Sequence, residues 1–211
     1  IIDLSKLSKK NNANILIAYN RRFYASVRKA KEIIEKDKGV KSFNFEFTEW
    51  SHIIESLDNP ISELNNWVIA NSTHVIDTAF YLGGKPKEMV CFTSGSLSWH
   101  PSSSIFSGAG KSEKDALFSY HANWESPGRW VVEILTKNYR LVFKPMEKLQ
   151  IQKIGSIALN FVEDIDYTID EEYKPGLYLQ TQEFIEGSFK NLCSIYEQEQ
   201  SMNYYKQISG Y

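Results

Sequence analysis

The stretch VKSFNFEFTEW, residues 40–50, decides the fold class because its side chains repeat with a period of two. Phe43, Phe45 and Phe47 face one way, and the polar residues between them face the other. This alternation predicts a β-strand with one buried and one exposed face. Such strands are typical of antiparallel sheets that carry helices on one side only.

A different pattern precedes this strand. Residues 3–12 predict a helix, and ILIAYN (15–20) predicts a short apolar strand covered on both faces. From Arg21 to Lys38, apolar residues recur every three or four positions, which predicts an amphipathic helix that ends at Gly39. A helix followed by a buried strand is half a unit of a parallel sheet. We therefore expect residues 1–20 to be the edge of a different, parallel domain.

The sequence after the strand predicts one helix, a series of strands and a last helix. Residues 51–64 have no regular pattern, and a helix over 65–81 has Ser62 as a possible N-cap and ends at Gly83-Gly84. Lys137-Asn138 fits a tight hairpin turn. The last helix is expected over 176–199, with a short helical tail at 201–208. The strands are expected at 87–97, 115–124, 129–137, 139–144 and 148–154, with a further one at 157–163.

This order predicts an α+β fold with a largely antiparallel, open sheet and helices on one face. Two domain segments are expected, namely the edge at 1–20 and an α+β domain over 21–211.

Composition excludes several classes of protein. Of 211 residues, 42% are hydrophobic and 14% aromatic, which indicates a folded chain, and the net charge of −2 includes no basic stripe that would bind nucleic acid. No apolar run reaches the length of a membrane span. Cys91 and Cys193 lie in apolar surroundings and predict buried free thiols in a reducing compartment, so we expect a cytoplasmic protein. The chain begins at Ile1, which leads us to expect a piece of a longer protein.

Three familiar site motifs are not supported. SGAGKS (107–112) contains Gly-Lys-Ser, but a phosphate-binding loop would need glycine at Ile105, so we expect an ordinary loop. No G-x-G-x-x-G occurs, so the chain has no dinucleotide fingerprint. The four histidines form no ligand pair on one helix, and no metal site is predicted.

A histidine stands within the helix NNWVIANSTHVIDTAF (65–80). His74 shares a helix face with Asn71 and Asp77, at offsets of three residues to either side. Amide and carboxylate neighbours can hold an imidazole in one tautomer, as a general acid or base requires. The same pattern suits a structural histidine whose hydrogen bonds are satisfied, and spacing alone leaves both interpretations open.

Two adjacent arginines form the second candidate, in YNRRF (19–23). They lie where a predicted strand ends and a helix begins, which is where open α/β sheets place ligands. Arginines at this position can bind a carboxylate, a phosphate or a sugar hydroxyl. The alternative is a pair of solvated side chains in a first helical turn.

Together, ILIAYNRRF (15–23), NSTHVIDTAFYLGG (71–84), the meander of strands and KPGLYLQTQEF (174–184) resemble the C-terminal part of a Gfo/Idh/MocA-family oxidoreductase. These are NAD(P)-dependent sugar and cyclitol dehydrogenases. The resemblance covers nearly the whole chain and implies an α+β substrate-binding and oligomerisation domain. Residues 1–20 would be the last helix and strand of a Rossmann domain.

The resemblance also implies roles for particular residues. Asn20 and Arg21 would line the substrate pocket, and His74 would match the histidine that moves the substrate hydroxyl proton together with a lysine. Asp77 would contact a substrate hydroxyl, and Tyr178 would project toward the same pocket. The family often has aspartate four residues before the histidine, where this chain has Ala70. We expect the neighbouring Asn71 to replace part of its function.

The glycine-rich loop and the catalytic lysine of the family belong to its Rossmann domain. We therefore expect NAD or NADP in a full-length parent, no cofactor tightly bound to this chain, and no dehydrogenase activity from the chain alone. A sugar or nucleotide-sugar substrate and a homo-oligomer formed through the sheet face are implied. The alternative is a non-enzymatic sheet domain for self-association or sugar binding. A small hydrolase using His74 and Asp77 would lack a nucleophile.

Overall fold

The computed structural model describes residues 1–211, which form a large mixed sheet, a two-stranded ribbon and a set of helices. The α-helices are α1 (Ile2–Asn11), α2 (Ala25–Lys36), α3 (Ser51–Ile54), α4 (Ile61–Leu64), α5 (Thr73–Gly83), α6 (Thr168–Glu172), α7 (Leu177–Ile185) and α8 (Ile195–Ser209). A 3₁₀ turn, η1 (Asn20–Phe23), precedes α2, and a π-helical segment, η2 (Val68–Ser72), precedes α5.

The strands of the large sheet run in the order β3-β4-β5-β2-β6-β7-β8-β9. They are β2 (Ser42–Glu46), β3 (Pro86–Ser94), β4 (Ile105–Ser112), β5 (Leu117–Asn123), β6 (Val131–Leu135), β7 (Tyr139–Phe143), β8 (Gln150–Lys153) and β9 (Asn160–Phe161). Every neighbouring pair is antiparallel except β2 and β5, which are parallel. The expectation of a largely antiparallel sheet in an α+β fold is confirmed, and the turn at residues 137 and 138 joins β6 to β7.

The phenylalanines of β2 form the centre of the core, as their alternation predicts. Phe43, Phe45 and Phe47 are each at most 2% exposed. Phe80 of α5 contacts the first two rings edge to face, with centroids 6.1 and 5.4 Å apart. Burying each such side chain stabilises the fold by about 1.5–3 kcal/mol. Gly83 at the end of α5 lies so close to the Phe43 ring that any Cβ there would overlap it.

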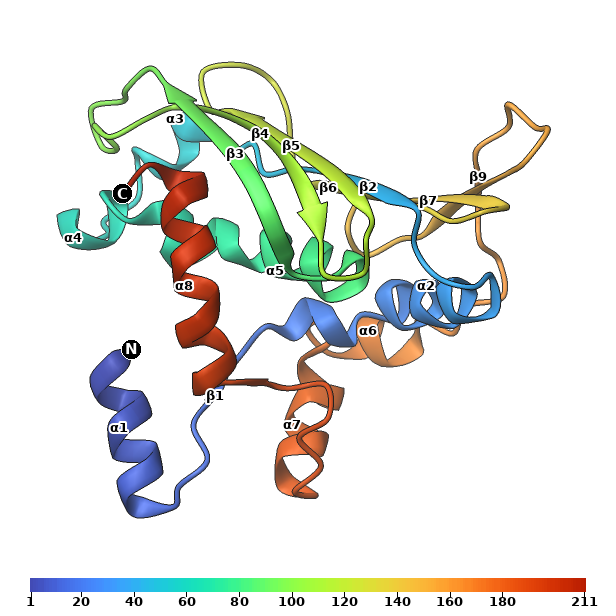
Figure 1. Ribbon diagram of the computed structural model, residues 1–211, viewed down its shortest axis with the longest axis horizontal. Coiled ribbons are helices and arrows are strands. Elements are labelled where there is room, and N and C mark those ends of the chain that lie inside the picture. The colour runs from blue at the N-terminus through green and yellow to red at the C-terminus, as the bar shows by residue number, and fades with distance from the viewer.

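The helices lie on one side of the large sheet. Figure 1 shows α5, α8 and α2 beneath the sheet, while the opposite face of β3, β4 and β5 carries no helix. Val90, Phe92 and Leu117 are exposed by 60–67% on these strands. The sheet is thus open on one face, as the sequence predicts.

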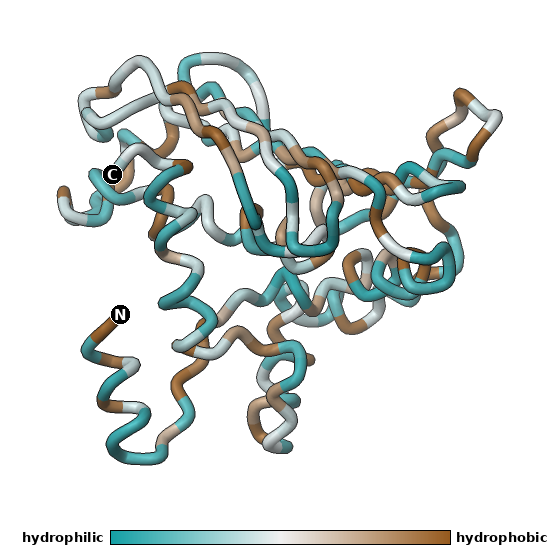
Figure 2. The backbone as a smooth tube through the Cα atoms, viewed as in Figure 1, coloured by the Kyte–Doolittle hydropathy of each residue, from teal (hydrophilic) through white to brown (hydrophobic).

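The hairpin from β8 to β9 extends away from the body of the molecule as an arm (Figure 1). Figure 2 shows hydrophobic segments at its tip, where Ile157 is 98% exposed. None of the helices combines the length and the hydropathy that a membrane span requires.

Strand β4 corrects the expectation of a loop at SGAGKS. Residues Ile105–Ser112 pair with β3 on one side and β5 on the other. Glycine is needed here because a Cβ at Gly108 would overlap the Tyr120 ring, and one at Gly110 would overlap the Glu88 carbonyl oxygen. The glycines that suggested a loop are therefore a sign of close backbone approach within a sheet.

Three other expectations about helices were wrong. The expected helix at 176–199 is divided into α7 and α8 by Gly187, which has a positive φ of 70°, and by the short strand β10 (Cys193–Ser194). Residues 51–64 contain the short helices α3 and α4. Ser62 lies within α4 and caps nothing.

The apolar strand expected at 15–20 is only two residues long. This strand, β1 (Leu16–Ile17), is half-buried and pairs antiparallel with β10, so it is not the fully covered strand of a parallel sheet. Figure 1 shows α1 and β1 apart from the large sheet. That residues 1–20 form the edge of a second domain stays a prediction.

Candidate functional site

His74 is the second residue of α5, the helix that follows directly on the π-helical segment η2. Thr73 and Val75 on either side of it are buried, whereas His74 is only half-buried. Its ring meets Tyr19 edge on, with centroids 5.3 Å apart, and its Nδ1 is buried without a hydrogen-bond partner. Buried polar atoms are nearly always satisfied, so this nitrogen shows that the structure does not supply the hydrogen bonds expected of a purely structural histidine. Irregular helical turns of this kind often occur at functional sites.

The surroundings of His74 keep its imidazole neutral. Burial, together with the positive charges of Arg21 and Lys174, lowers the pKa of His74 to about 4. At neutral pH the ring can therefore accept a hydrogen bond through one nitrogen and donate one through the other.

The segment YNRRF contacts the segment KPG. Asn20 donates from Nδ2 to the carbonyl oxygen of Pro175 at 2.9 Å. Gly176 has a positive φ of 71°, and a Cβ there would overlap the Asn20 carbonyl oxygen. Only glycine allows these two segments of the backbone to approach so closely. The structure thus brings Asn20, Arg21, His74 and Lys174 into one region.

The two arginines of this segment have opposite environments. Arg22 is 5% exposed and bound by carboxylates, whereas Arg21 forms no ion pair. The guanidinium of Arg21 stacks over Trp130 at 4.5 Å from the ring centroid. Burial lowers the pKa of Arg21 from its usual value.

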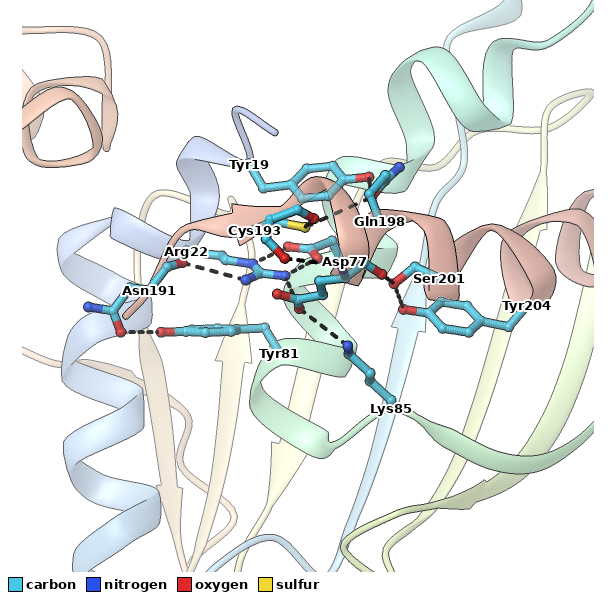
Figure 3. A network of polar contacts seen from close by, with 12 residues as sticks. Tyr19, Arg22, Asp77, Tyr81, Lys85, Asn191, Cys193, Gln198, Ser201 and Tyr204 are labelled. Atoms are coloured by element: carbon cyan, nitrogen blue, oxygen red, sulfur yellow. Dashed lines mark hydrogen bonds and ion pairs between the residues drawn. The ribbon is translucent and has the colours of Figure 1, made fainter. Parts of the chain in front are cut away.

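Asp77 is held by Arg22 through both carboxylate oxygens. Arg22 donates from Nε to Oδ2 at 2.8 Å and from Nη2 to Oδ1 at 2.6 Å. Nη2 also donates to Glu197 at 2.8 Å, and Lys85 lies 3.5 Å from the same Glu197 oxygen (Figure 3). Arg22 further stacks over Tyr81 at 4.8 Å. Asp77 is therefore placed one turn from His74, as expected, but its oxygens face a guanidinium.

This network has its own cation and does not resemble a metal site. Burial alone would lower the pKa of Arg22, but its hydrogen bonds and charges with Asp77 and Glu197 outweigh burial and raise it. Burial would raise the pKa of Glu197, and Arg22 and Lys85 more than offset this. Oxygen and sulfur atoms of Asp77, Cys193 and Glu197 lie within 4.8 Å of one another. Arg22 already occupies the space between the carboxylates, and burial raises the pKa of Cys193 to about 12, which disfavours a thiolate ligand.

Asn71 leads to a residue that sequence reasoning missed. Its Nδ2 donates to Oε1 of Glu49 at 3.0 Å, and the Ser72 hydroxyl donates to the same oxygen at 2.7 Å. Arg129 binds Oε2 of Glu49 at 3.1 Å. Burial raises the pKa of Glu49, which is 2% exposed. The sequence could have indicated Glu49. It follows Phe43, Phe45 and Phe47 at the same two-residue spacing, so the alternation predicts that its charged side chain also faces inward.

Tyr178 makes no contact with His74 in the structure. It is 44% exposed on α7, and its ring packs on Tyr173 with centroids 5.0 Å apart. No hydrogen bond or ring contact joins Tyr178 to His74, Asn20 or Arg21. Of the KPG segment, Lys174 is the residue whose charge reaches His74.

The fold matches a class of dehydrogenases among solved structures. No family profile and no curated protein matches the sequence. The inositol dehydrogenase homolog from Azotobacter vinelandii, solved with NADH and myo-inositol, aligns with 99% of this chain at a TM-score of 0.71 and 12% identity. UDP-N-acetylglucosamine 3-dehydrogenase GnnA from Acidithiobacillus ferrooxidans aligns with 98% of the chain at 0.69 and 11% identity. Levoglucosan dehydrogenase, in complex with NADH and levoglucosan, aligns with 75% at 0.57 and 22% identity.

These neighbours are Gfo/Idh/MocA-type dehydrogenases, so the expected resemblance is confirmed for the fold. The chain aligns with 64% of the length of each of the first two proteins and with 48% of the third. It thus spans less than two thirds of each of them.

Proposed function

We propose that the chain is the substrate-binding and oligomerisation part of a sugar or nucleotide-sugar dehydrogenase of the Gfo/Idh/MocA type. The observation that carries this proposal is the convergence on His74 of YNRRF and KPG, segments about 150 residues apart in the sequence. The dehydrogenase fold of the structural neighbours supports it.

His74 is the proposed proton-handling residue. Oxidation of a secondary hydroxyl requires that its proton be removed, and a positioned histidine is a common acceptor. Nδ1 of His74 is shielded from solvent, whereas Nε2 is not shielded and forms no hydrogen bond, so Nε2 is the atom suited to accept a hydrogen bond from the reacting hydroxyl. A lysine of the parent protein, as the resemblance implies, would share this proton.

The other predicted residues would bind and orient the substrate. Asn20 and Arg21 lie beside His74 and would bind further oxygen atoms of the sugar. Asn71 would act through its contact with the buried Glu49. Direct substrate contacts by Asp77 and Tyr178 stay predictions, and Asp77 would first have to be released from Arg22.

The residues of this chain do not fit a dinucleotide by themselves, because no glycine-rich turn begins a helix among them. NAD or NADP would be bound by the Rossmann domain of the parent, of which residues 1–20 would be the last helix and strand. The chemistry assigned to this chain therefore concerns the substrate and its proton. The chain alone is expected to reduce neither cofactor.

The open face of the large sheet is proposed to mediate self-association. Val90, Phe92 and Leu117 are exposed apolar side chains on β3 and β5, and we call these three residues the outer sheet patch. Exposed patches of this kind commonly mark protein interfaces. The same patch favours the second candidate function, a non-enzymatic sheet module for self-association or sugar binding.

The test uses the complete reading frame that contains this chain. The purified protein is mixed with NAD⁺ or NADP⁺ and a panel of sugars, uronates, sugar phosphates and nucleotide sugars, and cofactor reduction is followed by absorbance. His74→Ala should lower kcat by at least about 100-fold, the usual contribution of a positioned acid or base. His52→Ala, at an exposed position, is the matched control.

Two results would contradict the proposal. Full activity of the His74→Ala protein would remove His74 from the reaction. A reading frame that supplies no dinucleotide-binding domain, together with sugar binding that lacks any cofactor reduction, would favour the non-enzymatic module.

A further inference from the structure

Arg21 and Arg22 are adjacent in sequence, but only Arg22 forms ion pairs with carboxylates. Arg22 has Asp77 and Glu197 within 2.8 Å. Arg21 has no carboxylate within ion-pairing distance, and its one side-chain hydrogen bond goes to Oδ1 of Asn20 at 3.4 Å. The fold thus neutralises one guanidinium and leaves its neighbour without a counter-ion.

The position of Arg21 makes this absence costly. The side chain is half-buried, and its Nε is shielded from solvent without a partner. Leaving a charged donor desolvated and unpaired is unfavourable. Stacking on Trp130 holds the guanidinium plane in place but satisfies none of its N–H groups. A bound anion could accept hydrogen bonds from Nη2, which has no partner and, unlike Nε, is not shielded from solvent.

The other charges near Arg21 do not remove its need for a counter-ion. Glu49 and Glu147 attract Arg21 from beyond ion-pairing distance. Glu49 is already bound by Asn71, Ser72 and Arg129, and Glu147 is exposed to solvent. Arg129 adds positive charge on the same Trp130 ring, at 4.8 Å.

Lys174 is a second cation without a partner. It is exposed to solvent and forms no ion pair, and its charge reaches His74, as does that of Arg21. The charges of two cations without ion pairs thus act on the residue proposed to handle the substrate proton. Arg21 is half-buried, and a neutral sugar would leave it without a counter-ion.

We propose that the substrate bound at His74 carries an anionic group, a carboxylate or a phosphate, which Arg21 and Lys174 bind. The inference rests on the proposed function and narrows its substrate class to acidic or phosphorylated sugars. Planar guanidinium groups bind both anions through paired N–H donors, and an ammonium adds a point charge. Arg22, fixed by Asp77, keeps the backbone of η1 in place and leaves Arg21 free for the ligand.

The test is calorimetric titration of the full-length protein with glucose, glucuronate and glucose 6-phosphate. The anionic sugars should bind at least about 10-fold more tightly than glucose, as expected for a charge-assisted contact. Arg21→Gln and Lys174→Gln should each weaken anionic ligands about 10- to 100-fold, and should weaken glucose, which lacks the charged contact, by a clearly smaller factor. Arg28→Gln, at an exposed position of α2 without an ion pair, should change nothing.

Further measurements separate the two anions and guard against misfolding. Arg21→Lys retains the charge but loses the planar fork, so it should weaken glucuronate more than glucose 6-phosphate if the group is a carboxylate. Thermal unfolding midpoints show whether each variant is folded. If Arg21→Gln does not fold, the affinities of Lys174→Gln and Arg21→Lys for the anionic sugars test the inference instead.

Equal affinities for glucose and the anionic sugars, unchanged by Arg21→Gln, would overturn this inference and leave the dehydrogenase proposal standing. Binding of acetate or inorganic phosphate, lost in Arg21→Gln, without binding of any sugar would support the anion site and overturn the dehydrogenase proposal. Binding of no ligand at all would overturn both.

Discussion

Arg22 and Asp77, which are 55 residues apart in sequence, form a two-pronged ion pair in which both side chains are at most 5% exposed. The pair joins η1, which carries Asn20 and Arg21, to α5, which carries His74. It therefore fixes the relative position of the two segments that make the candidate site.

Removing one partner of this pair should be strongly destabilising. Arg22→Met leaves the buried Asp77 carboxylate without its cation, and such uncompensated charges cost about 3–5 kcal/mol. The free energy of unfolding in urea measures the effect. Lys6→Gln breaks a solvent-exposed pair with Asp3 and should leave the midpoint unchanged. A loss for Arg22→Met as small as that of the control would mean that the pair does not connect the two segments.

The fold was predictable where side-chain periodicity reports burial directly. The alternation at 40–50 and the hairpin at Lys137-Asn138 depend only on local sequence. Strand β4 was not predictable in this way. Its glycines are needed because the Tyr120 ring and the backbone of β3 leave no room for a Cβ, and neither neighbour can be inferred from the local sequence of β4. The division of the last helix likewise depends on the pairing of β10 with β1.

The candidate site was predictable in part. His74 and the arginines stand out from their local pattern, and the resemblance placed them together. Which arginine is paired and which is free follows from the η1 turn and from Glu197 on α8, and neither is visible in the spacing. Glu49 could have been found, since it places a charge at an inward position of the alternating stretch 40–50, beyond the end of β2.

The low pKa of His74 predicts a pH dependence of stability. The pKa falls from 6.5 to about 4 on folding, so the unfolded chain binds more protons between these values. Stability should therefore rise with pH from about 4 to 6.5, by at most about 3 kcal/mol on this account. His74→Gln should lose this part of the slope in urea titrations at several pH values. His52→Gln should retain it, and an unchanged slope in His74→Gln would refute the assignment.

Tyr211 should stabilise the start of the π-helical segment through His100. The His100 ring is fully buried, with Nδ1 2.6 Å from the Ser103 carbonyl oxygen and Nε2 2.5 Å from the Tyr211 hydroxyl. Nδ1 must donate to the carbonyl, so Nε2 accepts from Tyr211. Tyr211→Phe leaves Nε2 of His100 buried without a hydrogen bond, which should lower the free energy of unfolding by about 1–3 kcal/mol. Amide exchange at Val68, whose N–H contacts the Tyr211 hydroxyl, should also accelerate.

The control for this variant is Tyr178→Phe, which removes an exposed hydroxyl that makes no hydrogen bond and should leave both readouts unchanged. Equal effects of the two substitutions would show that the Tyr211 contact contributes nothing to η2.

Gly110 should tolerate no side chain. A Cβ there overlaps the Glu88 carbonyl oxygen and approaches Met89 and Phe118. Overpacking of this kind costs about 1–3 kcal/mol, so Gly110→Ala should lower the unfolding midpoint. Ser107→Ala, at an exposed position of the same strand, should not. A neutral Gly110→Ala would imply that β3 and β4 are more widely spaced.

The outer sheet patch should control the oligomeric state, because it is apolar and uncovered. Phe92→Glu places a charge where a second copy would bury an aromatic ring, and the desolvation of that charge opposes association. Analytical ultracentrifugation of the full-length protein should show an oligomer for the parent and smaller species for Phe92→Glu. Ile157→Glu introduces the same charge at the tip of the β8–β9 arm, where the side chain is 98% exposed against 67% for Phe92 but lies off the patch. If Ile157→Glu dissociates the oligomer instead, the interface lies on the arm. If the unsubstituted full-length protein is itself a monomer, neither surface is an interface.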